Sequence, residues 1–138
     1  MYSKNFVIRW ADLDANIHMR HSAYNDYAAQ TRLLFMAESG FGMEYFKINN
    51  VFPVLFREET VFHKEIHGNE NIRIDAMLVK MTEDGSRWTI MNRFYKENGI
   101  LAAKLTVDGA WMDIVARKLK VPPMELLELF NKLGKGES

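Results

Sequence analysis

The chain has no cysteine among its 138 residues. Disulfides, thiolate metal sites and thiol nucleophiles are therefore excluded. A net charge is also absent, because 18 basic residues balance 18 acidic ones, and this argues against a protein that binds nucleic acid through a broad basic face. No apolar run approaches the roughly 20 residues that span a bilayer, and the first residues show no signal-peptide pattern. We expect a cytoplasmic protein with no membrane insertion.

Low-complexity tracts, internal repeats and phosphate-binding motifs are absent as well. Neither GxxxxGK(S/T) nor GxGxxG occurs, so nucleotide hydrolysis and dinucleotide redox chemistry have no support in the sequence. Hydrophobic residues make up 48% of the chain, which is ample for a globular core. The length suits one domain, so we expect a single domain over residues 1–138.

The hydrophobic pattern predicts a strand, a long helix, four strands and a terminal helix. Phe6, Ile8 and Trp10 alternate with polar or flanking positions, as in a strand. From Tyr24 to Phe35 apolar residues recur three and four apart, as on a helix. Further strands are expected over 54–66, 72–81, 88–96 and 101–112, and a short helix over 121–133.

The long helix begins near Ser22, which is a suitable N-cap. Residues 43–46 are expected to form only a connecting segment. The short turns between the last four strands predict an antiparallel meander. Because the long helix is apolar around most of its circumference, we expect it to be buried on several sides by a curved sheet. The pattern thus predicts an α+β fold with one central helix.

The stretch RWADLDANIHMRHSAY, residues 9–24, holds two aspartates and half of the four histidines. By residue type it could be a metal site, a catalytic turn, or a solvated loop that ends in a helix cap. The histidines do not have HExxH spacing, and the sequence places no third histidine beside them. His63 and His67 fall far along the chain. We therefore expect neither a metal nor a resident cofactor.

The longer stretch RWADLDANIHMRHSAYNDYAAQTR resembles the opening signature of the hotdog-fold acyl-CoA thioesterases of the 4-hydroxybenzoyl-CoA thioesterase family. In that signature a strand ends in Asp-x-Asp, and a turn, a histidine or asparagine pair and a helical tyrosine follow. The phrase VFHKEIHGNENIRI resembles the family's second-strand hairpin. The resemblance implies a hotdog fold: a curved antiparallel five-stranded sheet wrapped around one long central helix, with a short C-terminal helix.

The resemblance also implies an activity and an assembly. The expected reaction is hydrolysis of an acyl or aryl thioester to a carboxylic acid and free coenzyme A, which enters only as part of the substrate. The expected assembly is a homodimer or homotetramer with active sites at the subunit interface. A non-catalytic acyl-CoA-binding or regulatory domain on the same fold is the alternative, and a purely structural dimerisation domain is a third class.

Carried over by position, the family's catalytic carboxylate falls on Asp14. His21, seven residues later, matches a histidine of the branch associated with the Tol–Pal system and is expected to assist. His18 matches a turn histidine of another branch, and Tyr24 begins the buried face of the helix. Glu58 and Glu59 open the long second strand, where the family often shows a polar residue facing the acyl pocket. Alternate residues of a strand face opposite sides, so at most one of the two can point inward. His18, Tyr24 and Glu59 are thus expected to contact the substrate.

The chemistry implied for Asp14 has two forms. The carboxylate can act as a general base toward water, or as a nucleophile that forms an anhydride. In both, amides at the helix N-terminus would bind the oxyanion, and the sequence leaves both routes open. Asp12 is expected to be structural, bonding backbone amides of the turn.

Overall fold

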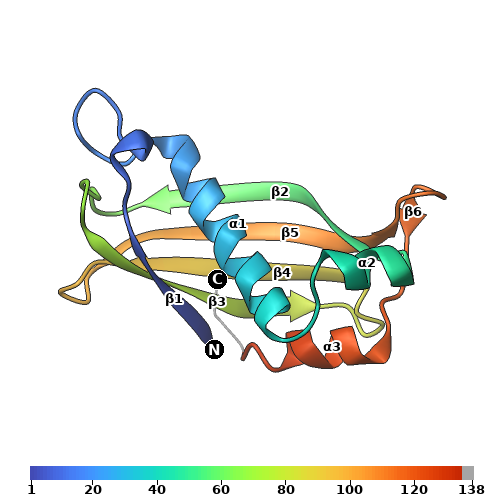
Figure 1. The fold of residues 1–138 in the computed structure, drawn as a ribbon. Helices are drawn as coiled ribbons and strands as arrows, with labels where there is room; N and C mark the ends of the chain where they lie inside the picture. Colours follow the sequence, from blue (N-terminus) through green and yellow to red (C-terminus); the bar gives the residue numbers. More distant parts are fainter. Residues whose placement is uncertain (135–138) are drawn as a thin grey trace.

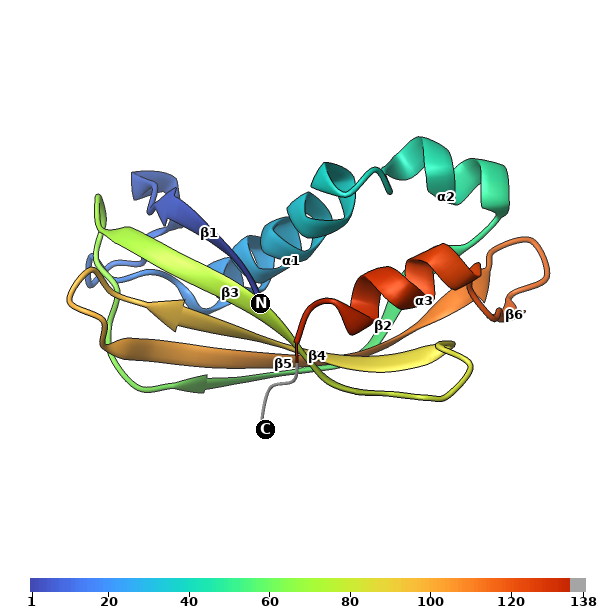
Figure 2. The same cartoon turned by 90° about the horizontal axis from the view of Figure 1, so that it is seen from below.

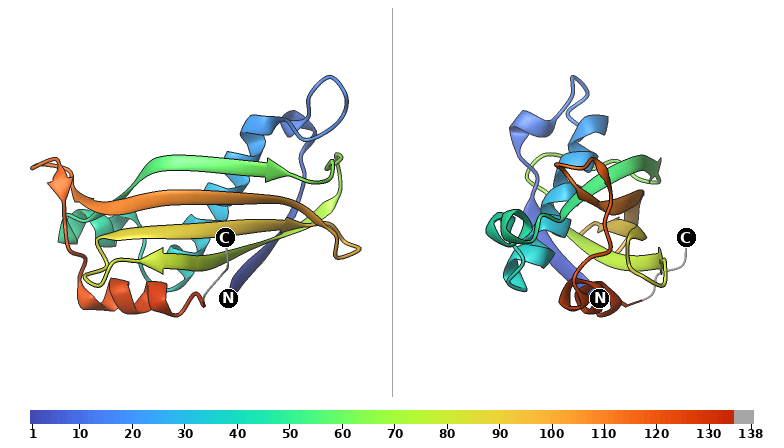
Figure 3. Two further views of the ribbon diagram at one scale, coloured as in Figure 1. Left: turned by 180° about the vertical axis from the view of Figure 1, so that it is seen from behind. Right: turned by 90° about the vertical axis from the view of Figure 1, so that its right-hand side faces the viewer.

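A computed structural model describes residues 1–134, and in it a curled antiparallel sheet carries helices on one face (Figure 1). In chain order the elements are β1 (Tyr2–Val7), a 3₁₀ turn (Trp10–Asp12), α1 (His21–Glu38), α2 (Met43–Asn49), β2 (Phe52–Phe62), β3 (Asn71–Met81), β4 (Arg87–Tyr95), β5 (Leu101–Asp113), β6 (Lys118–Leu119) and α3 (Met124–Asn131). Figure 2 shows α1 lying across one face of the sheet, with α3 beside its far end. Seen from behind, the other face of the sheet carries none of the helices of residues 1–134 (Figure 3). No helix in this range is long and apolar enough to cross a bilayer.

The strands lie in the order β1-β3-β4-β5-β2, and every neighbouring pair is antiparallel. The two-residue strand β6 pairs with the end of β5. Strands β3, β4 and β5 form the expected meander, but β2 pairs with β5 and not with β3. The expectation of a meander through all four strands is therefore wrong. The connection over residues 63–70 is long enough to carry the chain from one edge of the sheet past two strands, which a two-residue hairpin loop cannot do.

The face of the sheet toward α1 is apolar, as the alternation predicts. On β3, Ile72, Ile74, Ala76 and Leu78 are almost fully buried. Register shifts interrupt the ladders between Leu55 and Arg57 and between Leu78 and Lys80. Such bulges bend a strand and increase its twist, which lets the sheet curl around the helix.

Helix α1 confirms the predicted central helix. Its buried residues include Tyr24, Tyr27, Ala28 and Phe35, all on the side toward the sheet. The predicted N-cap residue was wrong: Arg20 is the N-cap residue, and Ser22 lies inside the first turn. The expected burial on several sides was also wrong for the single chain, since the side chain of Leu33 is 48% exposed.

Two local expectations differ from the structure. Strand β1 ends at Val7, and Trp10 lies in the 3₁₀ turn with 62% of its surface exposed, so the alternation through Trp10 was not a strand. Residues 43–49 form helix α2 and not a plain connection; Gly42 is its N-cap residue, and Asn50 ends it in the left-handed conformation. Only Phe46 of this helix is buried, so its apolar signal in the sequence is weak.

A buried arginine ties α1 to the sheet. The Arg32 guanidinium donates through Nη1 to Oδ1 of Asn92 at 2.8 Å, and Asn92 donates through Nδ2 to the backbone oxygen of Asp75 at 3.0 Å. Arg32 is only 7% exposed. Burial lowers the pKa of Arg32 to about 10, with the charge of Glu58 acting in the opposite direction. No carboxylate of residues 1–134 forms an ion pair with Arg32.

Candidate active site

Asp12 anchors the segment that leads into α1. Its carboxylate accepts hydrogen bonds from Arg9 Nε at 2.9 Å, Arg9 Nη2 at 3.0 Å, Arg20 Nη2 at 3.1 Å and the Tyr27 hydroxyl at 2.8 Å. The bonds from Arg9, followed by that from Tyr27, hold the pKa of Asp12 below its usual value against the opposing effect of burial. Asp12 is therefore structural, as expected, but its side chain bonds these three residues and not the backbone amides of the turn.

Asp14 opens a tight turn that ends at His18. The Asp14 amide donates to the His18 carbonyl at 2.8 Å, and Asp14 Oδ1 accepts from the amides of Asn16 at 2.9 Å and His18 at 3.3 Å. Ile17 completes the turn with φ of 62°, a conformation that a β-branched residue rarely adopts. Oδ2 of Asp14 accepts no hydrogen bond from residues 1–134. The turn thus fixes one carboxylate oxygen and leaves the other available.

The N-terminus of α1 follows directly after this turn. The Ala23 amide donates to the Arg20 carbonyl at 3.0 Å, whereas within the described range the amides of His21 and Ser22 have no acceptor. The N-cap residue Arg20 makes no side-chain capping bond to them. Unpaired amides at the positive end of a helix dipole suit a developing negative charge.

Asp14 and the start of α1 line one pocket, with a volume of about 330 Å³. One wall is formed by residues 62–66, which begin at the last residue of β2, and the other by Asp14, Asn16, His18, Met19, His21 and Tyr24. The ring centroids of His21 and Phe62 are 5.1 Å apart, and those of Tyr24 and Phe62 are 5.0 Å apart. Burial, reinforced by nearby acidic groups, raises the pKa of Tyr24 to about 12. The phenol therefore stays protonated at neutral pH and can donate a hydrogen bond.

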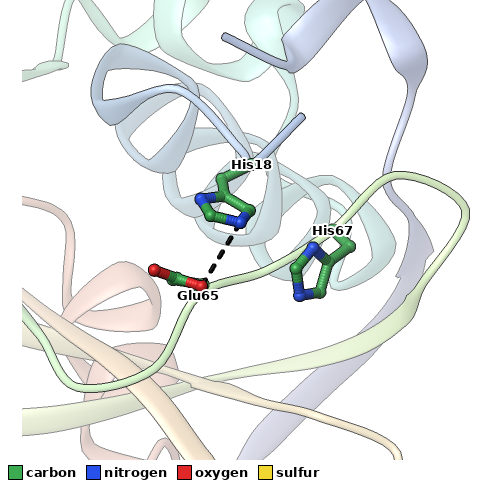
Figure 4. A group of neighbouring side chains, drawn as sticks. All are labelled: His18, Glu65 and His67. Carbon is green, nitrogen blue, oxygen red and sulfur yellow. Dashed lines mark ion pairs between the residues drawn. The ribbon is translucent and has the colours of Figure 1, made fainter. Parts of the chain in front are cut away.

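His18 lies at the rim of this pocket and faces the segment after β2. Its Nε2 lies 3.2 Å from Glu65 Oε2, and its ring centroid lies 4.8 Å from that of His67, with the rings nearly perpendicular (Figure 4). The backbones of His18 and His67 form an isolated antiparallel bridge. The fold thus joins two segments that lie far apart in the sequence.

Glu59 does not line this pocket, and its expected contact with the substrate stays a prediction. Its carboxylate accepts a hydrogen bond from Arg57 at 2.7 Å and lies beside Lys104 and Thr106 on the face of the sheet opposite α1. Because side chains alternate along a strand, the neighbouring Glu58 lies on the α1 side, where its charge acts on Arg32.

A second cavity lies between α1 and the sheet and shares no lining residue with the first. It has a volume of about 160 Å³ and is lined by apolar side chains, among them Met36, Trp88 and Phe130, together with Arg32. Its walls suit an apolar group of modest size.

Comparison with known protein families shows the family to which the chain belongs. A family model described as the thioesterase-like superfamily matches residues 8–130, which include the turn, the pocket and the whole sheet beyond β1. The chain belongs to this superfamily. Among curated proteins, no match to the chain was found.

Solved structures confirm that this member of the thioesterase-like superfamily has the hotdog fold. A hypothetical protein from Aquifex aeolicus superposes with a TM-score of 0.85 at 19% identity, over 94% of this chain and 99% of that one. A Staphylococcus aureus protein solved in complex with CoA gives 0.83 at 17% identity, over 96% and 80%. A 1,4-dihydroxy-2-naphthoyl-CoA thioesterase from Synechocystis gives 0.86 at 10% identity, over 96% of both chains.

For this thioesterase-like chain, the sequence found one wall of the pocket and missed the other. Asp14, His18, His21 and Tyr24 line a common pocket, and their expected roles toward a substrate stay predictions. Residues 62–66 were assigned to a strand, with no role in the site. Their position depends on the crossing of the chain between β2 and β3, and local periodicity carries no signal for that crossing.

Proposed function

We propose that the chain is an acyl-CoA thioesterase that uses Asp14 as its catalytic carboxylate. The observation that carries the proposal is the turn over residues 14–18: two amides hold Oδ1 of Asp14, while Oδ2 stays available in a pocket that also contains the start of α1. Membership of the thioesterase-like superfamily supports thioester hydrolysis as the reaction. A structure named as a CoA thioesterase and another solved with CoA share the fold and support coenzyme A as the carrier.

The proposed reaction begins with a thioester carbonyl oxygen accepting hydrogen bonds from the unpaired amides at the start of α1. In one route Asp14 takes a proton from water as the water oxygen bonds to the carbonyl carbon. In the other route Asp14 itself bonds to that carbon, and water later cleaves the anhydride. In both routes the C–S bond breaks, and the thiolate leaves and takes up a proton.

His21 and Tyr24 would assist from the same pocket. The imidazole of His21 lies at the first position of α1, where it can orient the attacking water or protonate the leaving thiolate. The protonated hydroxyl of Tyr24 can donate to the substrate. His18, paired with Glu65, would shape the entrance of the pocket.

Asp14→Asn tests this assignment directly. The amide keeps the size of the side chain and an oxygen that can accept from Asn16 and His18, so the fold should persist. Loss of the carboxylate removes both possible roles, and we expect turnover of an acyl-CoA panel to fall by about 10² to 10⁴. Affinity for a non-hydrolysable acyl-CoA thioether should change little, because the pocket and the helix amides remain.

Asp26→Asn provides the matched control. Asp26 is an exposed carboxylate in the second turn of α1 and does not line the pocket, so turnover should remain near wild type. The turnover of His21→Ala should lie between that of Asp14→Asn and that of Asp26→Asn. If folded Asp14→Asn turns over within a factor of a few of wild type, the catalytic assignment is wrong. If the wild-type chain binds the thioether but hydrolyses no acyl-CoA, the chain is instead a non-catalytic acyl-CoA-binding domain.

We also propose a homodimer or homotetramer with the pockets at a subunit interface. Strand β2 is an edge of the sheet, and its side chains Leu55, Phe56, Val61 and Phe62 are between 40% and 56% exposed. Phe62 also lines the pocket, and unpaired edge strands with apolar side chains favour association. Light scattering after gel filtration should give at least twice the chain mass of 16.1 kDa. A monomer at micromolar concentration would contradict an interfacial site.

A further inference from the structure

Three potential metal ligands converge where the turn before α1 meets the connection between β2 and β3. His18 and His67 lie directly opposite each other in an antiparallel bridge, and the Met19 amide donates to the Ile66 carbonyl at 2.7 Å. Glu65 and His67 are exposed, while Ile66 between them is fully buried. In an extended segment residues two apart share a face. Glu65 and His67 therefore point to the same side, on which the side chain of His18 also lies.

The ligand atoms are already close together. One nitrogen from each histidine and one oxygen from Glu65 all lie within 4.8 Å of one another. His18 Nε2 and Glu65 Oε2 are 3.2 Å apart, whereas two ligands of one tetrahedral zinc ion are separated by roughly 3.4 Å at usual bond lengths. The ring of His67 makes no hydrogen bond or ion pair with residues 1–134. Figure 4 shows His67 beside the His18–Glu65 pair, so a rotation of its exposed side chain can bring the third ligand into place.

We propose that His18, Glu65 and His67 bind a divalent transition-metal ion, with Zn²⁺ as the preferred candidate. Two imidazoles and one carboxylate form a donor set typical of zinc and other borderline metals, whereas Ca²⁺ and Mg²⁺ require oxygen ligands. Three protein ligands leave at least one coordination position for water or a ligand from solution. Because His18 and Glu65 also line the candidate active-site pocket, the ion lies at its rim.

The sequence argued against a metal because the histidines lack HExxH spacing and no third histidine is placed near His18 and His21. The fold supplies two further ligands from residues 65–67, and the trio uses His18 without His21. The proposal does not rest on thioester hydrolysis, since its tests measure metal binding and stability. Failure of the thioesterase assignment and failure of the metal site can therefore be distinguished.

The experiment is a calorimetric titration of chelator-stripped protein with ZnCl₂. The wild-type chain should bind one Zn²⁺ per chain at this site. His67→Ala removes a ring that makes no hydrogen bond or ion pair with residues 1–134, and we expect Zn²⁺ affinity to fall at least about tenfold, since even loss of a group supporting a ligand costs that much. Glu65→Gln should weaken binding similarly. His63→Ala is the matched control, because His63 is an exposed histidine of the same segment outside the trio, and its affinity should equal that of wild type.

Thermal unfolding provides the second measurement. Zn²⁺ should raise the Tm of wild type and of His63→Ala, because the ion bridges two segments only in the folded chain, and at the same Zn²⁺ concentration it should raise the Tm of His67→Ala less. Circular dichroism without metal should show that all variants are folded. Absence of one-to-one binding to wild type overturns the proposal. The proposal is also overturned if both His67→Ala and Glu65→Gln bind Zn²⁺ as tightly as wild type. It is overturned equally if His63→Ala loses as much Zn²⁺ affinity as they do.

Discussion

The network around Asp12 allows a stability prediction with a defined pH dependence. Asp12→Asn keeps the shape of a side chain that is 2% exposed, but it replaces a carboxylate oxygen by an NH₂ group that points at other donors. Breaking a buried ion pair typically costs about 3–5 kcal/mol. Here Arg9 and Arg20 reach solvent, with 71% and 37% of their side chains exposed, so their charges can be hydrated after the substitution. We therefore expect a loss of about 2–3 kcal/mol, mainly from the bonds to charged donors and to the buried Tyr27 hydroxyl.

For a chain of 138 residues, that loss lowers Tm by roughly 7–10 °C at the usual unfolding entropy per residue. The pKa of Asp12 is lowered in the folded state, so its contribution is fully present at neutral pH and disappears as pH falls through the folded pKa. The difference in stability between wild type and Asp12→Asn should therefore be largest at neutral pH and smallest well below 3.8, the ordinary pKa of an aspartate.

The assay is urea unfolding monitored by circular dichroism, once at neutral pH and once at a pH well below 3.8. Asp14→Asn is the control, since Asp14 is exposed, and its unfolding free energy should change by less than about 1 kcal/mol. The reasoning is refuted if Asp12→Asn unfolds within about 0.5 kcal/mol of wild type at neutral pH. A stability difference that stays constant on acidification would refute it equally.

Two further substitutions test the packing around Gly109 within the sheet and the burial of Arg32 between α1 and the sheet. Gly109→Ala should destabilise the chain by about 1–3 kcal/mol, because a Cβ atom there would lie 2.7 Å from Trp88 Cζ3 and 2.7 Å from the Val54 carbonyl oxygen. Gly42→Ala, where nothing lies within 4 Å of the added atom, should cost less than about 1 kcal/mol in the same urea titration, and equal losses for the two would contradict this packing. Arg32→Met should leave the free energy of unfolding within about 1 kcal/mol of wild type. The substitution loses the hydrogen bond to Asn92, but it also removes the cost of burying an arginine that has no ion pair among residues 1–134. A loss above about 3 kcal/mol would show that this buried charge stabilises the fold.

The sequence predicts the elements whose evidence is local. The central helix, the strands β3, β4 and β5 and the terminal helix each appear close to their expected positions, because periodicity and turn residues act within a few residues. Trp10 was misassigned since three alternating apolar residues cannot show where a strand stops pairing. Helix α2 was missed because one buried residue gives no periodicity, although Gly42 and the left-handed Asn50 mark its ends.

The candidate site was predicted only where one continuous stretch forms it. The residues from Asp14 to Tyr24 were recognised together because they are adjacent in the sequence. The opposite wall, the bridge between His18 and His67 and the outward direction of Glu59 all depend on which strands pair and in what register. Pairings between distant strands are set by the whole fold, and a single sequence read for periodicity does not contain them.

The placement of β1 and β2 at opposite edges of the sheet also bears on the order of folding. Tight turns join β3, β4 and β5, so these strands can pair with their neighbours along the chain. In contrast, β1 pairs with β3 and β2 pairs with β5 across long stretches of chain. Closing such large loops is entropically unfavourable until the contacts form, and it slows folding. The two pocket walls, residues 14–24 and 62–66, adjoin these two late strands. We therefore expect the pocket to be completed late in folding, after the meander has formed the surface against which both edges assemble.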